Sequence, residues 1–189
     1  MALTDIGLAN RALVRLGAET IASFTDDTVA AEIAGTLYTS ARDDLLSAHP
    51  WHFATGQVAL SELGTSPVAD FAKAYALPND FLRAMAAGSG GRGRGIVYRL
   101  TGGELHTNAD SVILTYIFRP DESVFPPFFD AALITRLAAE FCIPLTENTS
   151  RSETLFRLAE QAFIRAKQID SQQDSPARID GFPLITSRF

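Results

Sequence analysis

One proline sets the main boundary in this chain. Apolar residues recur every three or four positions over 26–48, which predicts an amphipathic helix, and Pro50 follows directly. Because proline cannot continue a helix and pushes the residue before it towards an extended conformation, this helix must end near His49. The chain's only tryptophan, Trp51, comes next with Phe53. Since large aromatic side chains favour burial, we predict a structural pivot of Pro50, Trp51 and Phe53 between a helical layer and the following segments.

Three other segments carry the same helical periodicity. A first helix is expected over about 4–17. A third is expected over 127–143, ending before Pro144, and a fourth over 151–170, starting at the capping box Ser150-Arg151-Ser152-Glu153. Because the links within each helix pair are short, we expect the four helices to pack as an antiparallel bundle.

The segment between the two helix pairs has the pattern of β structure. Period-two alternation near 56–63, 70–77, 96–100 and 112–118, interrupted by turn-forming residues, predicts short strands. We expect a small antiparallel meander, the β insertion 56–118, which is only marginally stable alone and so suited to contacts between subunits. The predicted fold is α+β: an antiparallel four-helix bundle with a small antiparallel β insertion between helices 2 and 3.

After residue 170 the helical pattern stops, and a polar stretch follows over 171–176. A wholly disordered segment would ordinarily be poor in large apolar side chains. This one regains them: Ile179, Phe182, Leu184, Ile185 and Phe189. We therefore interpret 171–189 as an extended C-terminal docking tail, ordered only against a partner, attached to a single domain over 1–170.

Composition limits the possible partners. The 189 residues carry a formal net charge of −6. Because affinity for nucleic acid comes mostly from cations that neutralise phosphates, this charge argues against a protein whose main task is to bind nucleic acid. No apolar run approaches the roughly 20 residues that span a bilayer, so we expect no membrane contact and synthesis in a cytoplasm. The single cysteine, Cys142, lies in an apolar helical run, where a small buried side chain is expected rather than a reactive thiol.

The sequence carries none of the usual catalytic or metal-binding motifs. His49 and His52 flank Trp51 without a cysteine or acidic partner at a metal-binding spacing, which favours a structural role. The pairs Asp26-Asp27 and Asp43-Asp44 are typical of helix caps and helix surfaces. Adjacent helical residues also diverge by about a quarter turn, so such pairs do not converge on one ion. We expect no enzymatic activity, no cofactor and no metal.

The glycine-rich loop over 89–95 offers one possible phosphate contact. Arg92 and Arg94 can present forked donors among glycines with little steric hindrance. Ordering a glycine-rich loop is entropically costly, however. Contact with phosphate, contact with a protein partner, and a mobile solvated loop are therefore three open interpretations.

Several short motifs, taken in order, resemble one family. The run Ala41–Ala54 contains Arg-Asp, Leu-Leu and His-Pro-Trp-x-Phe-Ala elements. Ile6–Leu13 and Leu16–Ala18 precede it, Tyr75–Arg83 follows it, and the helix pair Phe128–Ile169 fits the second half. In this order and spacing they resemble the tail tubular protein A family of head-to-tail adaptors in short-tailed phages and related particles.

The resemblance implies an architectural role with no catalytic residues to carry over. Family members form a ring, generally dodecameric, between portal and tail, and genome DNA passes through the ring without sequence-specific binding. The implied partners are further copies of the chain, a portal protein and a downstream tail or stopper protein. The implied location is the head-tail junction of a virion assembled in the host cytoplasm. The tail after Asp170 matches the family least.

The alternative is a small nucleic-acid-binding module, or an unrecognised enzyme whose site is assembled from scattered residues. A binding module would show salt-sensitive affinity for duplex DNA. An enzyme would show a convergent pocket with perturbed titratable groups.

Overall fold

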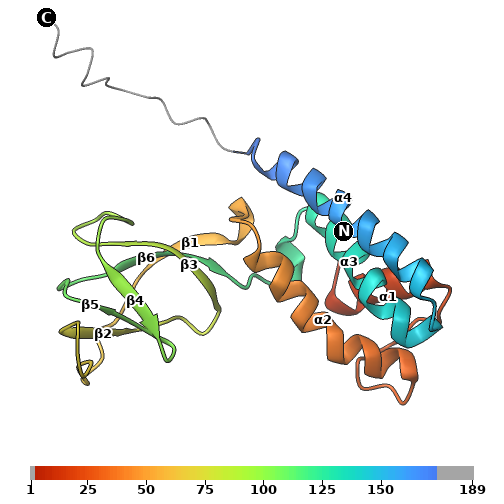
Figure 1. The fold of residues 1–189 in the computed structure, drawn as a ribbon, viewed down its shortest axis with the longest axis horizontal. Helices are drawn as coiled ribbons and strands as arrows, with labels where there is room; N and C mark the ends of the chain where they lie inside the picture. Colours follow the sequence, from red (N-terminus) through yellow and green to blue (C-terminus); the bar gives the residue numbers. More distant parts are fainter. Residues whose placement is uncertain (1–2, 174–189) are drawn as a thin grey trace, which may run out of the picture.

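The computed structural model describes residues 3–173, which form a helical lobe and a β lobe (Figure 1). The helical lobe consists of α1 (Asp5–Leu16), α2 (Val29–Ser47), α3 (Pro127–Thr146) and α4 (Thr149–Asp170). Residues 174–189 lie outside the described part, and so do the expected docking residues Ile179, Phe182, Leu184, Ile185 and Phe189. The docking role of the tail therefore stays a prediction.

The ends of α1 and α2 follow local sequence signals. The Thr4 hydroxyl accepts a hydrogen bond from the Gly7 N–H at 3.1 Å, and Gly17 ends α1 in the left-handed region with φ 76°. Thr28 caps α2, accepting from the Ala31 N–H at 3.2 Å. The helix predicted over 26–48 therefore starts a few residues later than expected, because Thr28 provides the cap.

Two predicted boundaries in the second helix pair are wrong. Pro144 lies inside α3, which continues to Thr146 and ends at Glu147 with φ 52°. The proline removes one intrahelical bond, the one that an N–H at 144 would donate to the Glu140 carbonyl, but the helix resumes after it and the Glu147 N–H donates to the Ile143 carbonyl at 2.9 Å. The predicted capping box at Ser150 is not the start of α4. Asn148 is the N-cap, and its side-chain oxygen accepts from the Arg151 N–H at 2.9 Å.

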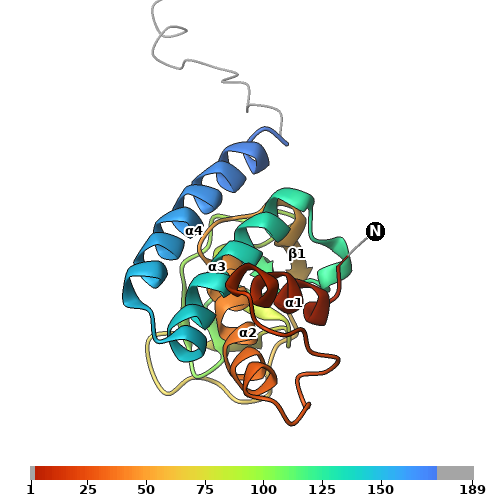
Figure 2. The same ribbon diagram turned by 90° about the vertical axis from the view of Figure 1, so that its right-hand side faces the viewer.

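The helices do not form the expected antiparallel four-helix bundle. The central helix is α3, with ten buried residues, and α1, α2 and α4 pack around it (Figure 2). Arg15 of α1 reaches Thr135 of α3, while Arg11, one turn earlier in α1, lies near Asp130, about one turn earlier in α3. The two helices therefore run in the same direction. An up-down bundle would give these two helices the same relative direction; the bundle prediction is wrong because α3 is buried on several faces and enclosed by the other helices, instead of contributing one apolar stripe to a shared core.

The β region is not one small meander either. The first antiparallel sheet has the order β1 (Thr55–Ala59), β6 (Ile113–Phe118), β3 (Phe81–Gly88). The second, also antiparallel, has the order β2 (Lys73–Ala76), β5 (Glu104–Thr107), β4 (Tyr98–Thr101). The hairpin of β4 and β5 matches the expectation, but β6 crosses to the other sheet and pairs with β1 and β3.

The two sheets enclose a hydrophobic core of their own. Its buried members come from both sheets and the loop before β6: Tyr75, Ala87, Leu105, Val112, Leu114 and Tyr116. A region with a separate core can hold its strands without help from a neighbouring subunit, which corrects the idea of a marginal insertion. The architecture is therefore α+β with a helical lobe and a two-sheet β lobe, not a bundle with a small insertion.

The predicted burial of Trp51 is confirmed. The side chain is fully buried, and its indole Nε1–H donates to the Leu45 carbonyl at 3.0 Å. Its ring lies 5.1 Å from that of Phe129 in α3 and 5.9 Å from that of Phe163 in α4, between centroids. Phe53 is only half-buried, with its ring 5.0 Å from that of Phe129. Pro50 and Trp51 thus place the end of α2 against both later helices, just before β1.

Candidate docking groove

A furrow with a volume of about 740 Å³ runs between α3 and α4. The α4 side of this furrow is one stripe of the helix, spaced by three and four residues. The two walls are chiefly apolar and include Phe128, Ala131, Leu158, Ala162, Ala166 and Ile169. The arginines Arg15 and Arg165 lie at its edges. A furrow of this kind suits the apolar side chains of a peptide segment.

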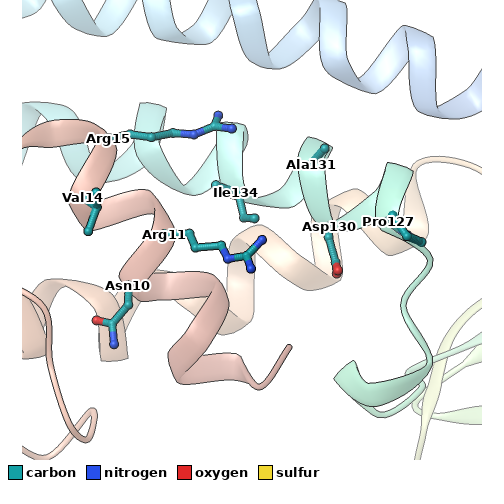
Figure 3. Close-up of a pocket in the computed structure, with 8 residues that line it drawn as sticks. All are labelled: Asn10, Arg11, Val14, Arg15, Pro127, Asp130, Ala131 and Ile134. Carbon is teal, nitrogen blue, oxygen red and sulfur yellow. The ribbon is translucent and has the colours of Figure 1, made fainter. Parts of the chain in front are cut away.

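A second hollow, of about 470 Å³, lies on the other side of α3, against α1 (Figure 3). It shares Arg15, Pro127 and Ala131 with the first furrow. Because Ala131 is exposed and has only a methyl side chain, the ridge between the two hollows is low. We call the two hollows together the α3 groove.

Both edges of the α3 groove expose large apolar side chains. Val14 of α1 is 61% exposed and Leu158 of α4 is 46% exposed. Scattered exposed apolar residues need no explanation, but Val14 lines the hollow against α1 and Leu158 lines the furrow against α4. The groove therefore has the character of a protein-docking surface.

Asp130 lies in the hollow between α1 and α3, and the Arg11 side chain extends from α1 towards it (Figure 3). Its Oδ1 atom is buried and has no hydrogen-bond partner among the described residues. Burial raises the pKa of Asp130 above its ordinary value, and the nearby positive charge of Arg11 opposes this only in part. The groove thus contains a carboxylate whose charged form is disfavoured.

The residues of the Ala41–Ala54 motif build a different surface, which we call the junction between the lobes. Arg119, just after β6, donates two hydrogen bonds to Asp43, the shorter at 2.6 Å. Arg42 donates to Asp43 at 3.0 Å and to Glu122 at 2.7 Å. The Tyr38 hydroxyl also donates to Glu122, at 3.2 Å. These charge-assisted bonds connect α2 directly to the segment that follows the β lobe.

The junction shifts the pKa of Asp43 in the opposite direction from that of Asp130. Burial works to raise the pKa of Asp43, but the hydrogen bonds from Arg119 and Arg42 outweigh it, so the pKa lies below its ordinary value. Asp43 was expected on the helix surface, yet its side chain is only 20% exposed. Its neighbour Asp44 is exposed and pairs with Arg136 at 3.2 Å. The two adjacent carboxylates point to different partners, as predicted for neighbouring helical residues.

Asp170 attaches the end of α4 to the same junction. Its side chain is 1% exposed and accepts a hydrogen bond from the His52 backbone N–H at 3.2 Å. The His52 ring lies 3.0 Å from the carboxylate, and the His49 ring lies 3.4 Å from it. Burial lowers the pKa of His49, and the attraction of Asp170 opposes this shift. The sequence placed the two histidines at the pivot but gave no sign that Asp170, more than a hundred residues later, would join them.

The loop that contains Arg92 and Arg94 lies in the β lobe, away from the α3 groove (Figure 1). Both arginines are exposed. The loop itself is held: the Thr115 hydroxyl donates to the Gly93 carbonyl at 3.0 Å, and a Cβ on Gly93 would lie 2.7 Å from the Thr115 Oγ1. Glycine at 93 therefore permits close packing on the sheet. The structure does not bring Arg92 and Arg94 together with Pro50, Trp51 or Phe53.

Sequence reasoning missed the α3 groove. Arg15, Ala131 and Leu158 come from three helices and carry no shared motif. The one usable signal was the apolar stripe of α4, in which Leu158 stays 46% exposed and lines the groove.

Within residues 3–173, no group of three or more His, Cys, Asp or Glu side chains is placed to hold a metal ion. Across the same residues, no helix has the length and apolar character required to cross a membrane. Cys142 is buried, and its Sγ lies 3.4 Å from the Thr146 hydroxyl.

A scan of the chain against protein-family models gives no match, and a search of curated proteins also finds no similar sequence.

Proposed function

We propose that this chain is a structural head-to-tail adaptor, a subunit of a ring between the portal and the tail of a phage or phage-like particle. The observation that carries the proposal is the use of the Ala41–Ala54 motif, through which the chain resembles adaptors of the tail tubular protein A family. Arg42, Asp43, Trp51 and both histidines of this motif make the contacts that join α2 to the rest of the molecule. The motif therefore has an architectural use rather than a chemical one.

The two lobes offer a ring subunit separate contact surfaces. A ring needs a heterologous interface, in which two different surfaces of the same chain meet. The α3 groove is one apolar surface, on the helical lobe. On the β lobe, the edge strand β4 and the residue before it expose Val97 (79%) and Leu100 (40%). Unpaired backbone groups at such an edge can be covered by a neighbour.

In this proposal the lobes hold a fixed angle because partly buried ion pairs join α2 to the segment that follows the β lobe. The tail segment with Ile179, Phe182, Leu184, Ile185 and Phe189 attaches the ring to the portal. The acidic chain, with net charge −6, lets genome DNA pass without holding it. A downstream tail or stopper protein binds the other end of the ring, and the chain is located at the neck of the virion.

The test is assembly. The purified chain, alone and mixed with the portal protein of the same particle, is imaged by electron microscopy and weighed by native mass spectrometry. The expected result is a closed ring of many copies on the portal. The variant Leu100→Asp on β4 should weaken ring closure, whereas Val29→Asp, an exposed position on α2, serves as a matched control.

A chain that stays monomeric and does not attach to the portal would contradict the proposal. Tight binding to duplex DNA that weakens steeply with added salt would instead favour the nucleic-acid-binding alternative. Loss of that binding on replacing Arg92 and Arg94 would identify the contact.

A further inference from the structure

The α3 groove opens at the point where the chain leaves α4. Ile169 lines the groove, and the next residue, Asp170, ends the helix. The buried Asp170 carboxylate is held by the His52 N–H and lies beside the His49 ring, so the root of the tail has a fixed position. The part of the chain after Gln173 therefore begins beside one end of the α3 groove.

The length of chain that follows matches the groove. From Leu158 to Ile169 the α4 wall spans about 16 Å, at ~1.5 Å per helical residue. Residues 171–173 still form a hydrogen-bonded turn after α4, and residues 174–178 reach about 16 Å when extended, at ~3.3 Å per residue, which is enough to reverse direction. Six further extended residues then cover about 20 Å, slightly more than the length of the wall.

The chemistry of the segment also matches. The α3 groove exposes Val14 and Leu158 at its edges and has Ala131 on its low ridge. A furrow lined by small side chains has room for large apolar ones. Burying each large apolar side chain contributes about 1.5–3 kcal/mol of stabilising free energy. The segment 179–189 carries five such apolar side chains.

Residues 179–189 are covalently joined to α4, and this tether favours them over a separate partner as the occupant of the α3 groove. A segment joined by a short linker has an effective concentration in the millimolar range at its own groove. A second copy of the chain at micromolar concentration competes poorly with it. We propose that residues 179–189 cover the α3 groove of their own chain when no partner is bound, so that a partner of the tail must first displace it from the groove.

This inference does not depend on the adaptor function, because it concerns the isolated chain. Its test uses methyl NMR of the full chain and of a chain ending at Gln173. Groove methyls are Val14, Ile134, Leu158 and Ile169. Control methyls, exposed elsewhere, are Val29, Val97 and Ile143.

Truncation should shift the groove methyl resonances and leave the control resonances unchanged. The shifts should be the same at 50-fold different protein concentrations, because the contact is intramolecular. The double substitution Phe182→Ala and Leu184→Ala in the full chain should reproduce them, which keeps the test valid even if truncation impairs folding.

A variant of the groove provides the matched comparison. Ala131→Trp fills the low ridge and should release the tail, whereas Thr39→Trp, at an exposed position on α2, should not. Groove resonances that do not respond to truncation or to the double substitution would overturn the inference. Shifts that vanish on dilution would also overturn it, because they would identify the tail of a second copy as the occupant.

Discussion

The junction and the α3 groove are built by neighbouring helices, but polar groups are paired and apolar side chains buried at the junction, whereas both are left partly uncovered in the groove. At the junction the carboxylates of Asp43 and Asp170 have charged or N–H partners, and Trp51 is fully buried. In the groove, Asp130 Oδ1 is buried without a described partner, and Val14 and Leu158 are exposed. A surface whose polar groups are already paired and whose apolar side chains are already buried gains no stability from a partner. A surface with an unpaired carboxylate oxygen and exposed apolar side chains can gain stability by binding one. We therefore expect the junction to be rigid and the groove to be the surface that binds an apolar segment.

The largest effect is expected from emptying the junction core. Trp51→Ala should cost about 3–5 kcal/mol of unfolding free energy, because it leaves a cavity among Phe129, Phe163 and the end of α2. Urea denaturation followed by circular dichroism measures it. An unchanged midpoint would show that Trp51 does not hold the end of α2 against α3 and α4. Leu158→Ala, in the groove, is the contrasting variant and should cost far less because Leu158 is exposed.

The next effect is expected at Asp43. Asp43→Ala leaves Arg42 and Arg119 without their shared carboxylate and should cost about 1.5–3 kcal/mol at neutral pH. Asp44→Ala, at the exposed neighbouring position, should cost about 1 kcal/mol or less. Because the pKa of folded Asp43 lies below 3.8, its contribution is present above that pH and is lost as the pH falls through the folded pKa. Equal losses for the two variants would contradict the closed junction.

A smaller effect of opposite sign is expected in the groove. The pKa of Asp130 is raised above 3.8, so the folded state loses stability as the pH rises through the folded pKa. Asp130→Asn should therefore raise the melting temperature at pH 7, by the equivalent of about 1 kcal/mol or less after solvent screening. Below both pKa values the variant and the parent chain should melt alike. A lower melting temperature for Asp130→Asn than for the parent chain at pH 7 would mean that the charged Asp130 carboxylate is stabilised in the folded groove.

The smallest effect concerns His49. Burial lowers its pKa below 6.5, so the folded state binds the proton less readily than the unfolded state does. Stability is then complete above about pH 6.5 and declines as the pH falls towards the folded pKa. The ring C–H resonance in an NMR titration should have its midpoint below that of a short peptide spanning 47–53. A midpoint equal to or above the peptide's would show that Asp170, not burial, dominates at the junction.

Much of the local structure could be predicted from the sequence. The helix ends at Thr4 and Gly17, the forced end of α2 before Pro50 and the burial of Trp51 depend on residues close in the chain. The strand β3, Phe81–Gly88, was missed because its alanines and methionine carry no strand signal. It is a strand because it pairs with β6, about thirty residues later.

The sequence by itself determined both ends of α1, the end of α2 and the burial of Trp51, because caps, prolines and periodicity act within a few residues. Tertiary structure alone decided that α3 is the central helix on which α1 packs, that β6 belongs to a separate sheet from β5, and that Asp170 closes on His52. These choices join residues up to 120 positions apart, as for Arg15 and Thr135. Contacts at such separation depend on how whole lobes pack, and no local pattern encodes them. The α3 groove is of this second kind, since it exists only where three such helices meet.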